Sequence, residues 1–207
     1  PKIYLISPPK INTKTFPKIL SAILKEKIVS IFQLRLKHYS DNDLLKISET
    51  ISSICNHYKV TFILNDRVDI AKKINIDGVH LGKNDLNIKQ ARKILGRDKI
   101  IGSSCYNKIS LSIKSENLGS NYQAFGAFFK TTTKSKTTNI TLSSIYKYRK
   151  HTNNPIVGIG GLNKNNIKKL KFLKLDFLAF CSAVWYGKNT PLVEIKKINN
   201  VIESFNL

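Results

Sequence analysis

Short hydrophobic runs alternate with longer amphipathic segments along the whole chain of 207 residues. Eight of the short runs are rich in β-branched and other apolar residues, which is typical of strands. Several are apolar at consecutive positions, as expected for parallel strands that are covered on both faces. We predict strands at Lys2–Ser7, Ile31–Leu36, Thr61–Asn65, Gly78–Leu81, Lys99–Ser104, Tyr122–Phe129, Ile156–Gly160 and Phe177–Ser182.

The segments between these runs have helical spacing. In the segment after the second strand, Leu44, Ile47, Ile51 and Ile54 share one face of a helix. The segment after the fifth strand has the weakest pattern, because serine, asparagine and charged residues dilute its period. We predict helices at Asp41–Tyr58, Val68–Ile74, Ile88–Leu95, Asn107–Leu118, Leu142–His151, Asn165–Leu173 and Leu192–Phe205.

Repeated strand–helix alternation over this length predicts an α/β fold, a closed (β/α)8 TIM barrel near its minimum size. A doubly wound open sheet is the alternative, since the alternation of strands and helices does not by itself show whether the sheet closes into a barrel. Its dinucleotide-binding version lacks support, because no G-x-G-x-x-G motif follows the first strand. No linker interrupts the pattern, so we expect residues 1–207 to form a single TIM-barrel domain.

Composition argues against a membrane protein or a disulfide-bonded secreted protein. No apolar run approaches the ~20 residues that a membrane-spanning helix needs, and Pro8-Pro9 break the first run too early for a signal peptide. Cys55, Cys105 and Cys181 form no C-x-x-C pair and no zinc set. We therefore expect a cytoplasmic protein with no membrane partner.

The formal net charge of +22 raises nucleic-acid binding as a function. The lysines, however, are spread along the chain among many Asn and Ile residues, and no nucleic-acid-binding motif is present. We expect a solvated basic surface that steers phosphorylated substrates inward, with no nucleic-acid partner. A non-catalytic basic nucleic-acid-binding protein remains an alternative.

The predicted strand ends carry side chains suited to phosphate and metal binding. In a TIM barrel these ends build one site, and alternation after the second strand places Gln33, Arg35 and Lys37 on one face. Arg and Lys both hold phosphate oxygens. Asp66 and Asp85 follow neighbouring strands, and two carboxylates beside phosphate need a cation between them, a role that Mg²⁺ fills. A turn and helix cap is the alternative for Asp66.

The remaining strand ends supply hydroxyl groups, an ammonium group and glycines. Ser104 ends the fifth strand, and the loop after the sixth strand reads Thr131-Thr132-Thr133-Lys134. Gly161 and Ser182 follow the last two strands, whose loops often bind phosphate through backbone N–H groups. We expect His80 to pack inside the barrel. The pattern predicts two anion-binding regions, for two phosphorylated substrates or for one molecule with phosphates at both ends.

In this order and spacing, the motifs resemble those of the thiamine phosphate synthase family. The resemblance covers nearly the whole chain and is carried by segments 62–69 and 77–82 with Asp85, by Gln33-Leu34-Arg35 with Lys37, by Ile101-Gly102 with Ser104, by Thr131 with Thr133-Lys134, and by segment 158–161. It implies a TIM barrel that joins an aminopyrimidine diphosphate to a thiazole phosphate and releases pyrophosphate. Tyr106 departs from the family pattern, which often has His there, and so do Ala127 and Lys130, where prolines are common.

The resemblance also implies a role for each matching residue. Asp66 and Asp85 would bind Mg²⁺, the implied cofactor. The pyrimidine diphosphate would be held by Gln33, Arg35, Lys37, Asn65, Ser104 and Lys134, and the thiazole phosphate by Thr131, Thr133, Gly161, Cys181 and Ser182. A thiazole tautomerase-like barrel is the nearest alternative, but it would not need the metal and diphosphate residues. Self-association into a homo-oligomer is left open.

Overall fold

Eight parallel strands close into a barrel in chain order in the computed structural model, which describes residues 1–130 and 142–206. Each strand pairs with its sequence neighbours, and the first strand closes the circle by pairing with the last. Closure confirms the predicted TIM barrel and excludes the open doubly wound sheet. The strands are β1 (Lys2–Ile6), β2 (Val29–Leu34), β3 (Thr61–Asn65), β4 (Gly78–Leu81), β5 (Ile100–Tyr106), β6 (Tyr122–Phe125), β7 (Ile156–Ile159) and β8 (Phe177–Phe180).

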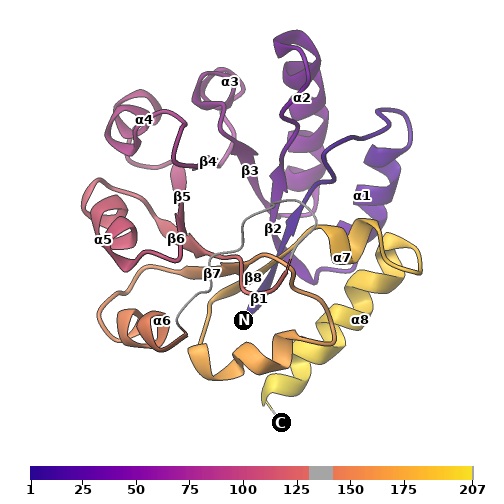
Figure 1. Ribbon diagram of the computed structural model, residues 1–207. Helices are drawn as coiled ribbons and strands as arrows, with labels where there is room; N and C mark the ends of the chain where they lie inside the picture. The colour runs from indigo at the N-terminus through magenta and orange to yellow at the C-terminus, as the bar shows by residue number, and fades with distance from the viewer. Residues whose placement is uncertain (131–141, 207) are drawn as a thin grey trace.

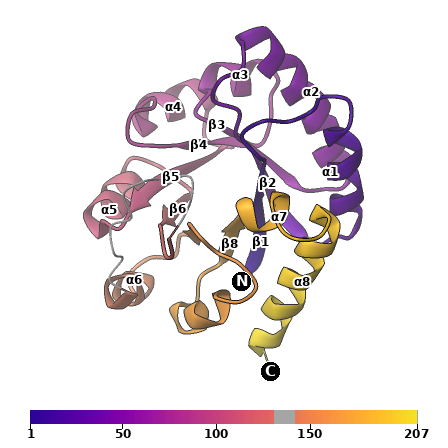
Figure 2. The same ribbon diagram turned by 45° about the vertical axis from the view of Figure 1, so that its right-hand side comes forward.

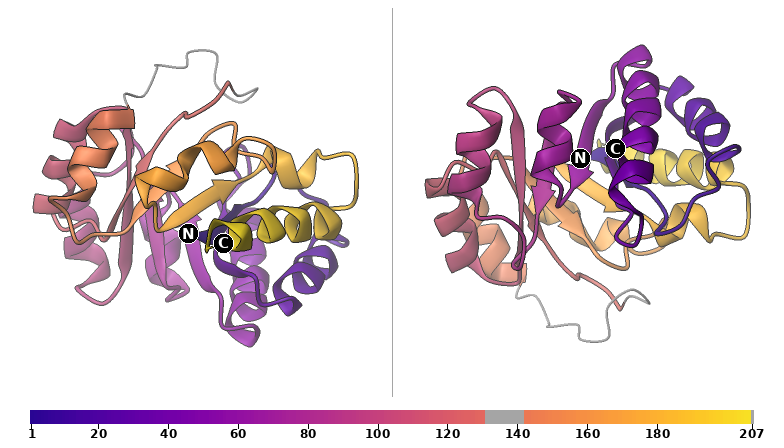
Figure 3. Two further views of the ribbon diagram at one scale, coloured as in Figure 1. Left: turned by 90° about the horizontal axis from the view of Figure 1, so that it is seen from below. Right: turned by 90° about the horizontal axis from the view of Figure 1, so that it is seen from above.

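Helices lie outside the strands and form a ring around them (Figures 1 and 2). The described helices are α1 (Phe16–Lys25), α2 (Asp41–His57), α3 (Val68–Lys73), α4 (Ile88–Leu95), α5 (Ile109–Asn117), α6 (Leu142–Arg149), the 3₁₀-helix η1 (Ile167–Leu173), α7 (Ser182–Trp185), α8 (Pro191–Glu203) and the 3₁₀-turn η2 (Ser204–Asn206). Because β1 starts at the end of the barrel to which α8 returns, the two termini lie close together (Figure 3).

The continuous apolar runs of the strands fill two separate cores. Leu5 and Phe32, for example, face outward and pack in the layer between strands and helices. Tyr4 and Tyr122 face inward and pack with small and branched side chains inside the barrel. Since both faces of each strand are covered, neither face can be polar, which explains why the strands show little period-two alternation.

The structure differs from the sequence-based prediction in a missed helix and in the ends of several strands. The prediction contains no helix between β1 and β2, where the structure has α1, with Phe16, Leu20, Ile23 and Leu24 buried on one face. β2 ends at Leu34 rather than two residues later, and β6 ends at Phe125 rather than four residues later. The residues after these two strand ends therefore belong to the loops at the C-terminal end of the barrel, and these loops are longer than expected.

A buried carboxylate ties together the loops that follow β7 and β8. The side chain of Glu194, in the first turn of α8, is 4% exposed and pairs with the Lys164 ammonium group at 2.7 Å. It also accepts a hydrogen bond from the Asn189 side chain at 2.5 Å. The Lys164 hydrogen bond, followed by that from Asn189, lowers the pKa of Glu194 to about 2.

Glu194→Gln should therefore destabilise the fold in a pH-dependent manner. An unfolded glutamate titrates near pH 4.3, so the depressed folded pKa contributes stability above about pH 5 that is lost as the pH falls toward 2. We expect the variant to lose roughly 2–3 kcal/mol of unfolding free energy at pH 7 and roughly half as much at pH 3, where the unfolded glutamate is largely protonated but the folded one is still ionised. Urea unfolding at both pH values measures this. Exposed Glu49 on α2 gives the matched control, Glu49→Gln, and an equal loss at both pH values for Glu194→Gln would contradict the role of its charge.

Candidate active site

A cavity of about 590 Å³ opens at the C-terminal ends of the strands. All but three of the site residues predicted from the sequence lie on its wall. They are Gln33, Arg35, Lys37, Asn65, Asp66, Asp85, Ser104, Gly161, Cys181 and Ser182. The other three, Thr131, Thr133 and Lys134, lie outside the described residues. One concave surface thus brings together side chains that are up to 149 positions apart in the sequence, from Gln33 to Ser182.

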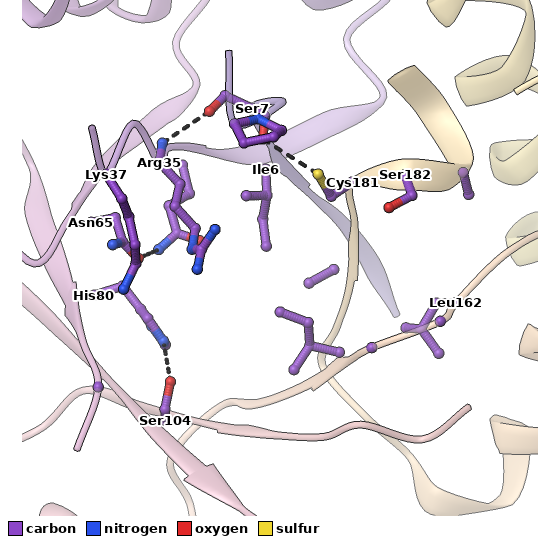
Figure 4. Close-up of a pocket in the computed structure, with 18 of the residues that line it drawn as sticks. Ile6, Ser7, Arg35, Lys37, Asn65, His80, Ser104, Leu162, Cys181 and Ser182 are labelled. Carbon is purple, nitrogen blue, oxygen red and sulfur yellow. Dashed lines mark hydrogen bonds between the residues drawn. The ribbon is translucent and has the colours of Figure 1, made fainter. Parts of the chain in front are cut away.

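Two cations lie on one side of the cavity, next to the end of β2 (Figure 4). The strand ends before Arg35 and Lys37, so strand alternation does not orient these side chains as the sequence suggested. Instead, the Arg35 backbone N–H donates to the Ser7 hydroxyl at 2.9 Å, which fixes the turn that follows the strand. Among the described residues, no carboxylate pairs with the Arg35 guanidinium group, which is therefore available to an anionic ligand.

A buried amide pair forms the floor beside the cations. The Gln33 side-chain NH₂ donates to the Asn65 side-chain oxygen at 3.1 Å, and both residues are nearly inaccessible to solvent. Each amide has one donor and one acceptor group. The contact leaves the Gln33 oxygen and the Asn65 NH₂ for a ligand, a combination that can recognise a ring nitrogen together with an exocyclic amine.

Asp66 and Asp85 face each other at the mouth of the barrel, as predicted from their strands. Asp66 has a left-handed backbone (φ 66°), and its carboxyl group lies close enough to that of Asp85 for the two to interact electrostatically. Burial, followed by the contact with Asp85, raises the pKa of Asp66, while Lys37 at 3.3 Å acts in the opposite direction. Asp85 also accepts a hydrogen bond from the Gly82 N–H at 2.6 Å.

The turn-and-cap alternative for Asp66 is not supported, because α3 is capped by Arg67 without a side-chain hydrogen bond. Arg67 itself is occupied by Asp41 and Asp69, so it does not reach the cavity.

The carboxylate pair fits a magnesium ion. Two neighbouring acidic groups repel each other when both are ionised, and a cation between them would relieve this repulsion. Within residues 1–130 and 142–206, no cluster of three or more His, Cys, Asp or Glu side chains could hold a metal. Mg²⁺ does not require such a cluster, since it commonly takes one or two carboxylates and completes its octahedron with water and phosphate oxygens.

The opposite side of the cavity is built from glycines and from the turn that begins α7 (Figure 4). Gly160 and Gly161 both have positive φ, and a Cβ on Gly161 would lie 2.5 Å from the Lys130 carbonyl oxygen. The Cys181 thiol donates to the Ser7 carbonyl oxygen at 3.4 Å, next to Ser182 at the start of α7. This side therefore offers mainly backbone groups, as the sequence predicted for the second anion-binding region.

Sequence reasoning missed several residues of the cavity wall. Ser7 links the ends of β2 and β8 through the Arg35 and Cys181 contacts, and its position directly after β1 was the available signal. Tyr106 lies on the wall with a left-handed backbone (φ 56°), and its hydroxyl accepts from the Lys83 N–H at 3.4 Å. His80 packs inside the barrel as predicted, but it also lines the cavity.

Comparison with known proteins gives consistent similarities. The family model described as thiamine monophosphate synthase matches residues 3–184. The thiamine-phosphate synthase of Pelagibacter ubique (strain HTCC1062) is 44% identical over 197 residues, 95% of each chain. That of Rhodospirillum centenum (strain ATCC 51521 / SW) is 34% identical over 201 residues, 97% of each chain. A solved thiamine phosphate pyrophosphorylase from Pyrococcus furiosus superimposes with a TM-score of 0.83 at 26% identity, covering 99% of this chain and 96% of that one.

Proposed function

The chain belongs to the thiamine monophosphate synthase family, and on that premise we propose how its barrel mouth makes thiamine phosphate. The enzyme is a transferase of thiamine biosynthesis. Its proposed substrates are an aminopyrimidine that carries a diphosphooxymethyl group and a thiazole phosphate. Its proposed products are thiamine phosphate and pyrophosphate. The observation that carries the proposal is one cavity with cations and paired carboxylates on one side and a glycine-rich loop on the other.

The cation side binds the pyrimidine diphosphate. Arg35 grips phosphate oxygens through its planar fork of N–H donors, and Lys37 and Lys134 add point charges. The Ser104 hydroxyl donates one further hydrogen bond to the same group. Gln33 and Asn65 use their remaining amide oxygen and NH₂ to orient the aminopyrimidine ring. Together these contacts place the reacting methylene carbon over the barrel axis.

Asp66 and Asp85 hold the magnesium ion. When bound, Mg²⁺ supplies positive charge that stabilises the departing pyrophosphate. Lys37 lies beside this pair on the cavity wall, with its ammonium group 3.3 Å from Asp66. Its charge therefore serves both the carboxylate pair and the leaving group.

The glycine side binds the thiazole phosphate. Gly161, Cys181 and Ser182 present backbone N–H groups and one hydroxyl, and we assign Thr131 and Thr133 to the same phosphate from the family resemblance of their sequence. Thiazole nitrogen is then held facing the pyrimidine methylene across the cavity, which supplies proximity.

The reaction is a displacement with no covalent enzyme intermediate. The C–O bond to the diphosphate breaks as Arg35, Lys37 and Lys134 stabilise the charge that develops on its oxygen. The electron-rich aminopyrimidine stabilises the resulting carbocation. Thiazole nitrogen attacks this carbon and forms the new C–N bond, so no side-chain nucleophile or general base is needed.

The direct test incubates the protein with both precursors and Mg²⁺ and detects thiamine phosphate by mass together with released pyrophosphate. We expect both products only when both substrates are present, and neither in EDTA. Isomerisation of a thiazole carboxylate phosphate alone, without metal, would identify the tautomerase alternative instead. Full activity in EDTA would contradict the role of the carboxylate pair.

Gly161→Ala should weaken thiazole phosphate binding selectively. The new methyl group would lie 2.5–2.7 Å from two backbone carbonyl oxygens of the loop after β6, at a residue with φ 68°. Neither the backbone at residue 161 nor that of the loop after β6 can move at low energetic cost, so the substitution must displace the loop. We expect the KM for the thiazole phosphate to rise roughly tenfold or more, since a misplaced anion loses charge-assisted hydrogen bonds. The KM for the pyrimidine diphosphate should change little. Steady-state kinetics with each substrate varied in turn measures the difference, and Gly96→Ala, at an open site far from the cavity, is the control.

The proposed setting of the enzyme is the cytoplasm, with small molecules as its partners. All three cysteines are free, which supports a reducing compartment. No described helix is long and apolar enough to span a membrane. The charge of +22 serves in this proposal to attract phosphorylated substrates, and no nucleic acid takes part. We treat residues 1–207 as one catalytic domain.

A further inference from the structure

Four side chains form a continuous hydrogen-bonded series across the interior of the barrel. The Tyr4 hydroxyl bonds the Tyr122 hydroxyl at 2.8 Å, and the Tyr122 hydroxyl bonds His80 Nδ1 at 2.9 Å. His80 Nε2 then bonds the Ser104 hydroxyl at 2.8 Å. We call Tyr4, Tyr122, His80 and Ser104 the barrel network. It joins the neighbouring strands β4, β5 and β6 to β1, which is not paired with any of them in the closed barrel.

The barrel network runs from the buried interior of the barrel to the cavity at the C-terminal ends of the strands. Tyr4 and Tyr122 are 2% and 4% exposed and do not line the cavity, whereas His80 and Ser104 do. Figure 4 shows the His80–Ser104 end of the network at the cavity wall, on the side of Arg35 and Lys37. Because Tyr4 does not line this cavity, the loss of its hydroxyl alone would act on a ligand through the hydrogen bonds of the network.

The interior is shaped to hold these side chains. Any side chain at Gly102 would collide with the ring and hydroxyl of Tyr122. The glycine leaves the slot in which Tyr122 lies, stacked on His80 with ring centroids 5.6 Å apart and edge-on to Tyr4 at 6.0 Å. Ordinary barrel interiors are filled by branched apolar side chains. Two tyrosines and a histidine at these positions therefore indicate a specific use of their polar atoms.

The number of available protons determines which group donates in each hydrogen bond of the network. Among the described residues, the Tyr122 oxygen is the only hydrogen-bond partner of the Tyr4 hydroxyl. A buried donor without an acceptor is costly, so Tyr4 donates to Tyr122. Tyr122 has one proton, which then goes to His80 Nδ1. Burial raises the pKa of both phenols, so both remain protonated.

The histidine tautomer follows from this direction. A neutral imidazole with an accepting Nδ1 has its proton on Nε2, and Nε2–H donates to the Ser104 oxygen. The Ser104 proton is then left to point into the cavity. The reverse direction would bury the Tyr4 proton with no acceptor, which is why the network has one favoured polarity.

We propose that Tyr4, Tyr122 and His80 are positioning residues that commit the Ser104 hydroxyl to donating its proton to an anionic ligand in the cavity. Without the two tyrosines, the hydroxyl could equally turn to donate to His80 Nε2 and present only a lone pair, which repels a phosphate oxygen. In taking that ligand to be the diphosphate of the pyrimidine substrate we rely on the proposed function.

The first test is the tautomer of His80 in the ligand-free protein, measured by NMR of isotope-labelled imidazole nitrogens. The chain has four histidines, and His80→Gln identifies the relevant signal. We expect Nδ1 unprotonated and Nε2 protonated. An Nδ1–H tautomer, or rapid averaging between the two, would overturn the inferred direction. Because no substrate is used, this result is independent of whether the protein makes thiamine phosphate.

The second test is a double-mutant cycle between Tyr4 and Ser104. Tyr4→Phe removes only the starting donor, and its near-identical shape preserves the packing. We expect it to raise the KM for the pyrimidine diphosphate about fivefold, equivalent to roughly one net hydrogen bond, and to leave the KM for the thiazole phosphate unchanged. In a Ser104→Ala background the same substitution should have no further effect, because its path to the ligand is missing.

Tyr148→Phe is the matched control, since it removes another buried tyrosine hydroxyl, hydrogen-bonded to Glu116 outside the barrel interior. We expect neither KM to change in this variant. Equal effects of Tyr4→Phe in the parent and the Ser104→Ala backgrounds would show a general structural role and overturn the proposal. If the parent protein makes no thiamine phosphate, the proposed function is wrong. The tautomer of His80 then still tests the inferred direction of the hydrogen bonds in the barrel network.

Discussion

Asp66→Asn should abolish turnover and leave the barrel at least as stable as the parent protein. Removing one carboxylate of the pair lowers affinity for the divalent ion and the stabilisation of the leaving pyrophosphate, which is worth several kcal/mol. We expect kcat to fall by about a thousandfold or more. Stability should not fall, because Asp66 is partly buried beside a like charge and in a left-handed conformation that asparagine tolerates well. Its ion pair with Lys37 is exposed and contributes little.

Thermal unfolding without metal and steady-state kinetics with added Mg²⁺ check both halves of this prediction. Asp85→Asn should lose activity to a similar extent, since Asp85 supplies the second carboxylate. Exposed Asp98, at the opposite end of the barrel just before β5, provides the control Asp98→Asn, with activity expected to remain at the parent level. An Asp66→Asn enzyme that keeps near-normal kcat would show that the carboxylate pair does not hold the required cation.

Arg35→Met should cause the second largest loss of activity, and the loss should appear only in kcat/KM for the pyrimidine diphosphate. The guanidinium group lies on the cavity wall and lacks a carboxylate partner among the described residues, unlike Arg67 and Arg149, which are ion-paired. Each hydrogen bond between charged groups contributes roughly 1.5–3 kcal/mol, so kcat/KM for that substrate should fall about a hundredfold. The KM for the thiazole phosphate should change less than threefold by rough estimate, because that substrate binds on the opposite side.

Arg35→Lys separates charge from geometry at this position. Lysine keeps the positive charge but loses the two-pronged contact, so we expect it to recover part of the loss, with a remaining deficit of about tenfold. Exposed Arg97 gives the control Arg97→Met. Equal increases in both KM values for Arg35→Met would mean that Arg35 maintains the shape of the cavity rather than gripping the diphosphate.

The fold was predictable because its signal is local and repeated. Each apolar run such as Thr61–Asn65 is recognised on its own, and the order of the runs implies the barrel. The helix α1 was missed although Pro17 in its first turn and the spacing of Phe16, Leu20, Ile23 and Leu24 are both helix signals. The sequence analysis assigned no element between the first two strands.

Site residues were predictable where they directly follow a strand. Asp66 and Asp85 could be placed at one barrel mouth because β3 and β4 are neighbours, and in the structure both line the same cavity. Arg35 was placed correctly on the cavity for an incomplete reason, since a hydrogen bond to Ser7 rather than strand alternation fixes its backbone. That bond joins residues 28 positions apart and has no local signature.

The hydrogen bonds of the barrel network could not be predicted from the sequence. Tyr4 and Tyr122 are 118 positions apart, and each resembles an ordinary strand tyrosine. Their contact depends on register around the closed barrel and on the slot left by Gly102. A side chain such as His80, correctly expected to pack in the interior, therefore acquires a further role only once the structure shows its partners.

Anomalous diffraction from crystals soaked with Mn²⁺ and pyrophosphate locates the divalent ion and the leaving group together. We expect one strong metal peak within about 2.0–2.4 Å of carboxylate oxygens from both Asp66 and Asp85, with pyrophosphate bridging from it to Arg35 and Lys37. A peak bound elsewhere, or pyrophosphate that does not contact these cations, would contradict the assignment of this end of the barrel as the catalytic site.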